Sequence, residues 1–314
     1  MSPTQPSAFA LVILSLAAGC SASPASTPGA GGTSGGTAGA GGTAATAGTG
    51  ATGGGTGGVG GGATCPGPGY VTAPTTRTFT SVTATVQDLS GAPVTKALAQ
   101  VCGTDLCING GPADAQGKVF VDMSGQTLMN PHFKYGNGLL HVKFIMGLPE
   151  QAVVDLGIVK TAALPDVTTG APMAPGGTAT SGGVSLTVPS SASITTDPFL
   201  PEGADGFRAV VIPKEQAPVA VDATKAFEII VGTAPLETKF CPPAALSVPN
   251  SAGWPAGTAV EFWIEGLDIT EEWAPYGGWQ KTSDGAVSAD GATVATDPAG
   301  GIAWLSSVVA IRKK

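Results

Sequence analysis

Hydrophobic and polar residues alternate with a period of two in many short runs after residue 76. In the run 82–87, Val82, Ala84 and Val86 would share one face of a strand, and polar residues would occupy the other face. Turns rich in Gly, Asn and Asp separate the runs, and no window has the period of an α-helix. The pattern therefore predicts an all-β protein with two β-sandwich modules. The alternating runs are 82–87, 118–123, 139–145, 152–160, 183–189, 226–232, 259–266 and 285–297.

The phase of the alternation also predicts which side chains point inward. The expected inward sets are Val119, Val121 and Met123; Leu140, Val142 and Phe144; Val154, Leu156 and Ile158; Val184, Leu186 and Val188; Phe227, Ile229 and Val231; and Val260, Phe262 and Ile264. Asp290-Gly291 divides the last run and is a candidate for a type I′ hairpin turn.

The runs fall into two groups, which suggests two domains. We expect one β-sandwich over residues 76–163 and a second over 183–314, joined by a Pro/Gly/Thr-rich linker at 164–182. Residues 1–19 are expected to be a signal peptide and residues 20–75 a disordered tether.

The first twenty residues resemble a bacterial lipoprotein signal. An apolar stretch from Ala8 to Ala18 is too short to span a membrane and ends in small residues, as a signal peptide does. The motif Ala17-Ala18-Gly19-Cys20 resembles the lipobox, in which the cysteine becomes the acylated N-terminus. Ser21 follows the cysteine, and this resemblance implies sorting to the outer membrane. Ordinary secretion, with cleavage after Cys20, remains the alternative.

The segment after Cys20 consists almost entirely of small residues. From Ser21 to Thr64 only Pro24, Pro28 and Val59 depart from Gly, Ala, Ser and Thr. Such a chain cannot bury enough apolar surface to offset the entropy lost on ordering. As a flexible coil it would have a mean end-to-end distance of roughly 35–40 Å. It resembles the stalks of lipoproteins in myxobacteria and their relatives.

The first module resembles the carboxypeptidase regulatory-like (transthyretin-like) domain. The motifs that carry the resemblance are the Gly91-Ala92-Pro93-Val94 turn after a strand and the Asp114 to Gly117 hairpin. The resemblance implies a β-sandwich that acts as a spacer or docking module. In the second module, "GGVSLTVP" and "AALSVPNSAGWPAGTAVEFWIEG" resemble ZU5/GAIN-like β-sandwiches of bacterial surface proteins. Autoproteolysis of the GAIN type needs a His, and His141 is the last one in the chain.

The sequence offers little catalytic chemistry, and we predict that the protein is not an enzyme and carries no cofactor. His132 and His141 are the only histidines, and no nucleophile-elbow, zinc-protease, Walker or EF-hand motif is present. Glu271-Glu272 is a carboxylate pair, but adjacent residues on a strand would face opposite ways. The net charge of −8 leaves no basic footprint for nucleic acid.

Four cysteines follow the predicted lipid site. In an exported chain they fit two disulfides with three possible connectivities. Cys102 and Cys107 bracket a turn-sized insert, so we favour Cys102–Cys107 and Cys65–Cys241. A four-cysteine zinc site would show paired short spacings that Cys65 and Cys241 lack.

The run "EEWAPYGGWQK" contains Trp273, Tyr276 and Trp279 among Pro and Gly residues. Exposed aromatic rings could stack on sugars, whereas buried rings would close the core. We therefore expect a surface lipoprotein with a structural or adhesive, non-catalytic role, attached to the membrane by its lipid. The alternative is a carbohydrate- or cell-wall-binding module that uses these three rings, and another surface protein is a further possible partner.

Overall fold

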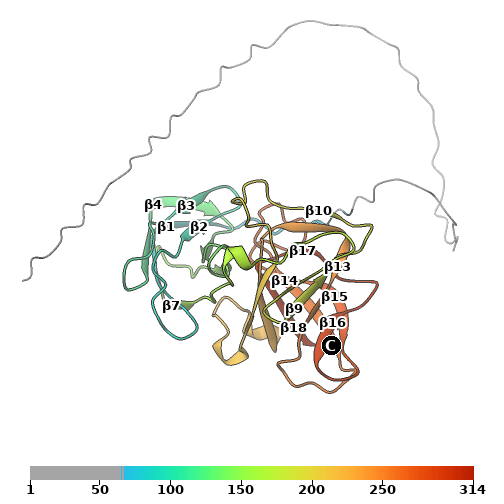
Figure 1. The fold of residues 1–314 in the computed structure, drawn as a ribbon. Coiled ribbons are helices and arrows are strands. Elements are labelled where there is room, and N and C mark those ends of the chain that lie inside the picture. The colour runs from blue at the N-terminus through green and yellow to red at the C-terminus, as the bar shows by residue number, and fades with distance from the viewer. Residues whose placement is uncertain (1–64, 66) are drawn as a thin grey trace, which may run out of the picture. The chain divides into compact units, whose positions relative to one another are not determined.

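The computed structural model describes residue 65 and residues 67–314, and this part of the chain is all-β (Figure 1). The predicted signal peptide, Cys20 and most of the predicted tether lie outside the described residues. Within the described part, the only helical elements are three 3-10 turns at Val167–Thr169, Lys214–Gln216 and Ala223–Lys225. All described residues belong to one compact unit.

Two small sheets are built from residues 76–160. The first has the order β4-β1-β7 and the second the order β3-β2-β5-β6. β1 pairs antiparallel with β4 but parallel with β7, so the chain crosses over between β1 and β7. The strands are β1 (Thr76–Gln87), β2 (Ala99–Cys102), β3 (Cys107–Asn109), β4 (Lys118–Met129), β5 (His132–Tyr135), β6 (Phe144–Gly147) and β7 (Val153–Lys160).

The two small sheets bury their facing side chains in one hydrophobic cluster, as in a β-sandwich. The predicted inward residues of β1, which are Val82, Ala84 and Val86, are all buried in it. The aromatic rings of Phe133 and Tyr135 stack with centroids 5.7 Å apart in the same cluster. The alternation in the sequence therefore identified the buried face of β1 correctly.

The remaining strands form one large sheet. Its main path is β11-β12-β18-β14-β15-β16-β13-β9-β8, and β10 and β17 also pair with β13. The strands are β8 (Thr178–Ser181), β9 (Val184–Thr187), β10 (Ser193–Thr195), β11 (Arg208–Ile212), β12 (Ile229–Ala234), β13 (Thr238–Pro249), β14 (Ala259–Glu265), β15 (Trp279–Val287), β16 (Thr293–Thr296), β17 (Ile302–Leu305) and β18 (Val308–Lys313). Figure 1 shows several of these strands gathered around β13 and β14.

The two ends of this large sheet approach each other, which gives it a barrel-like form. The backbone N–H of Ala209 on β11 donates a hydrogen bond to Oγ of Ser181 on β8, at 3.1 Å. A second hydrophobic cluster fills the space that the sheet encloses. Val184, Leu186 and Phe262 belong to it, as their alternation predicts.

β12 and β18 are buried on both faces. In β12, Ile229 and Val231 point into the barrel cluster, whereas Ile230 belongs to the sandwich cluster. β18 divides in the same way, with Val309 in the barrel cluster and Val308 in the sandwich cluster. Since successive side chains on a strand face opposite ways, these strands join the two cores. The two groups of strands therefore share buried side chains.

The phase predicted for β7 is wrong at its C-terminal end. Ile158 is 59% exposed and Val159 is buried. Gly157 has a positive φ of 63°, and the pairing with β1 shifts register between Thr83 and Thr85. This bulge inserts one residue and so exchanges the faces of the side chains that follow it.

Four other expectations need correction. Leu140 is exposed, because the side chain of Asn137 accepts backbone hydrogen bonds in a turn and the strand begins only at Phe144. Phe227 precedes β12 and lies in the sandwich cluster, away from Ile229. The Asp290-Gly291 turn is not type I′, because only Gly291 has a positive φ, of 73°. Residues 164–182, the predicted linker, include β8, which pairs with β9.

Candidate functional site

The folded unit holds the start of the described chain in two ways. The first is covalent, because Cys65 forms a disulfide with Cys241 on β13, with Cα atoms 5.5 Å apart. β13 pairs with four strands, β9, β10, β16 and β17. The segment that emerges from the Gly-rich region is therefore bonded to the most extensively paired strand described in the large sheet.

The second attachment is a turn between β14 and β15 that carries Glu271 and Glu272. The Asp268 side chain accepts the backbone N–H of Thr270, and Glu271 adopts a left-handed φ of 52°. The backbone oxygens of the two glutamates accept the N–H groups of Tyr70 at 2.8 Å and Gly69 at 3.0 Å. The turn thus pairs with residues 69–70 like a short strand, and we call Glu271 and Glu272 the glutamate clamp.

Glu271 is buried and its carboxylate is fully engaged. One oxygen accepts the N–H of Thr72 at 2.7 Å, and the other accepts the N–H of Tyr276 at 2.8 Å and the Thr72 hydroxyl. Burial alone would raise the pKa of this carboxyl. The hydrogen bonds from Thr72 and Tyr276 outweigh burial and hold the pKa below its usual 4.5.

Glu272 completes the clamp on the other side. Its carboxylate accepts the N–H of Gly67 at 3.2 Å and forms an ion pair with Lys239 of β13. Burial opposes ionisation here too, but the bonds from Lys239 and Gly67 leave the pKa of Glu272 lowered. The two glutamates thus lie on a turn and not on a strand, and both carboxylates bind residues about 200 positions earlier in the chain.

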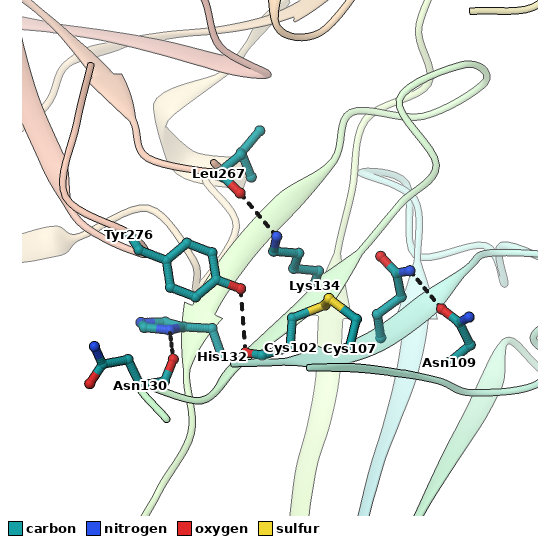
Figure 2. Close-up of a disulfide and its surroundings, with 9 residues drawn as sticks. Cys102, Cys107, Asn109, Asn130, His132, Lys134, Leu267 and Tyr276 are labelled. Atoms are coloured by element: carbon teal, nitrogen blue, oxygen red, sulfur yellow. Dashed lines mark hydrogen bonds between the residues drawn. A yellow bond between two sulfur atoms is a disulfide. The ribbon is translucent and has the colours of Figure 1, made fainter. Parts of the chain in front are cut away.

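Tyr276 lies at the contact between the two groups of strands (Figure 2). It is 2% exposed, and its hydroxyl donates to the backbone oxygen of Cys102 at 3.3 Å. The His132 ring meets it edge to face, with centroids 5.0 Å apart. Cys102 forms the second disulfide with Cys107 and closes the β2–β3 hairpin. Both disulfide pairs favoured from the sequence are thus formed.

A lysine is buried beside this tyrosine. Nζ of Lys134 donates to the backbone oxygen of Leu267 at 2.9 Å and lies 4.8 Å from the centroid of the Tyr276 ring (Figure 2). Burial, together with the charge of Lys143, lowers the pKa of Lys134 from 10.5 to about 8. Burial raises the pKa of the nearby Glu265 carboxyl well above 4.5. The hydrogen bond from Lys134 to Leu267 ties β5 to the loop after β14.

The three aromatic residues predicted to form a sugar platform do not lie side by side. Tyr276 is buried, so its ring is not accessible. Trp273 is partly buried against the barrel cluster, whereas Trp279 packs on Phe227 beside the sandwich cluster, with centroids 4.8 Å apart. Trp273 and Trp279 line two different surface depressions. A single platform built from all three is therefore wrong.

The two histidines have structural surroundings. Nδ1 of His132 lies 2.8 Å from the backbone oxygen of Asn130, and burial lowers the pKa of both His132 and His141. Among residues 65 and 67–314, no group of three or more His, Cys, Asp or Glu side chains is arranged to hold a metal ion. The same residues include no helix long and apolar enough to cross a membrane.

Comparison of the chain with protein-family models, with curated proteins and with solved structures finds no match. What is known of the glutamate clamp and its surroundings therefore comes from the sequence and structure of this chain. Sequence reasoning missed the glutamate clamp, because its carboxylates act on a distant segment. The only local signal was the run of two glutamates before a Pro/Gly-rich loop.

Proposed function

We propose that the protein is an envelope lipoprotein whose folded part is held away from the outer membrane and has a structural or adhesive, non-catalytic role. The observation that carries this proposal is the bond between Cys65 and Cys241. A force applied to the chain before Cys65 would be transmitted through the disulfide to β13. It would not break the hydrogen bonds that hold the segment after Cys65. A tethered module benefits from such an attachment.

We also propose that the first group of strands is a spacer or docking module that resembles the carboxypeptidase regulatory-like domain. Two turns support it. Gly91 N–H donates to the Asp88 oxygen at 3.1 Å in the first turn, and the Asp114 side chain accepts the N–H of Lys118 at 2.8 Å in the second. The motifs on which the resemblance rests therefore form turns, which supports the proposal. We likewise propose that the barrel-like part is related to ZU5/GAIN-like modules.

The anchor can be tested by metabolic labelling in a bacterial host fed a labelled fatty acid. The wild type should carry label and sediment with the outer membrane, and Cys20→Ala should carry none. Ser21→Asp is the matched control, because it should keep the label but shift the protein toward the inner membrane. Equal labelling of the wild type and Cys20→Ala would contradict the proposal.

A further inference from the structure

A depression of about 330 Å³ lies where the first described segment meets the start of β15. Pro68 and Tyr70 from the first described segment line it together with Trp273, Gln280 and Thr282. Small-molecule sites in proteins have volumes of roughly 300–1,000 Å³. The glutamate clamp and the Cys65–Cys241 bond hold the segment that contains Tyr70 against the barrel.

Two aromatic rings from distant parts of the chain line this depression. Tyr70 and Trp273 are both only partly buried. The indole nitrogen of Trp273 is buried, so the part of its ring that solvent reaches is carbon. Flat carbon surfaces of fixed rings stack on the C–H faces of sugars and lose little rotamer entropy on binding.

The polar lining suits hydroxyl groups. The Gln280 amide donates one hydrogen bond, to the Lys281 backbone oxygen at 3.0 Å, and an amide has further donor and acceptor sites. The Thr282 hydroxyl donates to the Gly301 oxygen at 3.3 Å and can still accept. These groups could bond to a ligand that presents several hydroxyls.

The charge of the depression is balanced. Its one lysine, Lys281, pairs with Asp284 at 2.9 Å and with Glu261 at 3.4 Å. An anionic ligand would have to compete with these carboxylates for the ammonium group. The lining therefore favours an uncharged ligand with apolar faces and hydroxyl edges, which is the chemistry of a neutral saccharide.

We infer that this depression is a binding site for a neutral oligosaccharide, with Tyr70 and Trp273 as stacking rings and Gln280 as the hydrogen-bonding group. The inference supplies a ligand class for the adhesive role but does not depend on acylation of Cys20. It replaces the three-ring platform with a pair of rings that the sequence separates by about 200 residues.

The test is calorimetric titration of the purified chain with maltohexaose, cellohexaose, chitohexaose and mannohexaose. At least one should bind, and Tyr70→Ala and Gln280→Ala should each weaken its binding by about tenfold or more, equivalent to 1.4 kcal/mol. Val71→Ala is the matched control for Tyr70→Ala, because Val71 is the next residue, is 95% exposed and does not line the depression. Trp279→Ala is a second control, because Trp279 is also partly buried but does not line this depression. Both controls should bind like the wild type.

Three outcomes would overturn the inference. They are no binding of any of the four sugars, binding that survives Tyr70→Ala and Gln280→Ala, and binding of a proline-rich peptide that competes at the same residues. Trp273→Phe keeps a stacking ring without the indole, so it should retain binding even if Trp273→Ala fails to fold. None of these results bears on the lipid anchor, which the labelling experiment tests separately.

Discussion

Cys65 and Cys241 are bonded to each other across 176 residues of sequence. The loop that this bond closes contains all of β1 to β12 and part of β13. Cys102 and Cys107, by contrast, are separated by only 5 residues and close a single hairpin. The two disulfides should therefore restrict the unfolded chain to very different extents.

Removal of the long-range disulfide should lower the free energy of unfolding more than removal of the short one. The chain-entropy relation gives about 5 kcal/mol for Cys65→Ala with Cys241→Ala and about 2 kcal/mol for Cys102→Ala with Cys107→Ala. Urea unfolding of the two double variants against wild type measures the difference. A larger loss for the hairpin pair would contradict the prediction.

Glu271→Gln should loosen the glutamate clamp. An amide presents one acceptor oxygen and an NH₂ group where the carboxylate accepts from Thr72 and Tyr276, so donors would face donors. We expect a loss of about 1–3 kcal/mol in unfolding free energy. Hydrogen exchange at the Thr72 and Tyr276 amides should also accelerate.

The control for this change is Glu150→Gln, since the Glu150 side chain is 88% exposed. The lowered pKa of Glu271 adds a pH test. Its contribution to stability should be complete above pH 4.5 and should disappear as the pH falls through the lowered pKa. The wild type should thus lose more stability on acidification than Glu271→Gln does, and identical acid profiles would refute this role.

Lys134 should make stability depend on pH at the alkaline side. Its pKa is about 8 in the folded chain and 10.5 is its ordinary value, so between these values only the unfolded chain retains the proton. The contribution of Lys134 to unfolding free energy should therefore rise as the pH increases from 8 to 10.5. Lys134→Met should remove this rise, as measured by urea unfolding across that range.

The matched control is Lys118→Met, because Lys118 is exposed at the start of β4. Lys118→Met should show the same rise of unfolding free energy between pH 8 and 10.5 as the wild type. If the unfolding free energies of the wild type and Lys134→Met changed in parallel with pH, burial would not lower the pKa of Lys134.

Gly157 and Gly147 offer a matched pair for the bulge in β7. A Cβ at either position would meet no atom within 4 Å, but only Gly157 has a positive φ. Gly157→Ala should destabilise the protein by about 1–2 kcal/mol through left-handed strain. Gly147→Ala should stabilise it by about 0.4–1 kcal/mol by restricting the unfolded chain. Thermal unfolding compares them, and an equal effect of both changes would argue against the bulge.

The sequence by itself determined the features that depend on local alternation. The period of two in residues 82–87 and 259–265 requires only that successive side chains of a strand face opposite ways, so it identified the class of fold and the buried Val82 and Phe262. Cysteine spacing likewise favoured the pairing that the structure contains.

Only the tertiary structure decided what each face packs against. Ile229 and Ile230 look alike in sequence, yet one faces the barrel and the other the sandwich, because both sides of β12 are covered. Tyr276 is buried where its hydroxyl meets Cys102 at the end of β2, and Glu271 is held by Thr72, 199 positions away. Contacts between such distant segments leave no periodic trace in the chain, since they arise only when the sheets pack together.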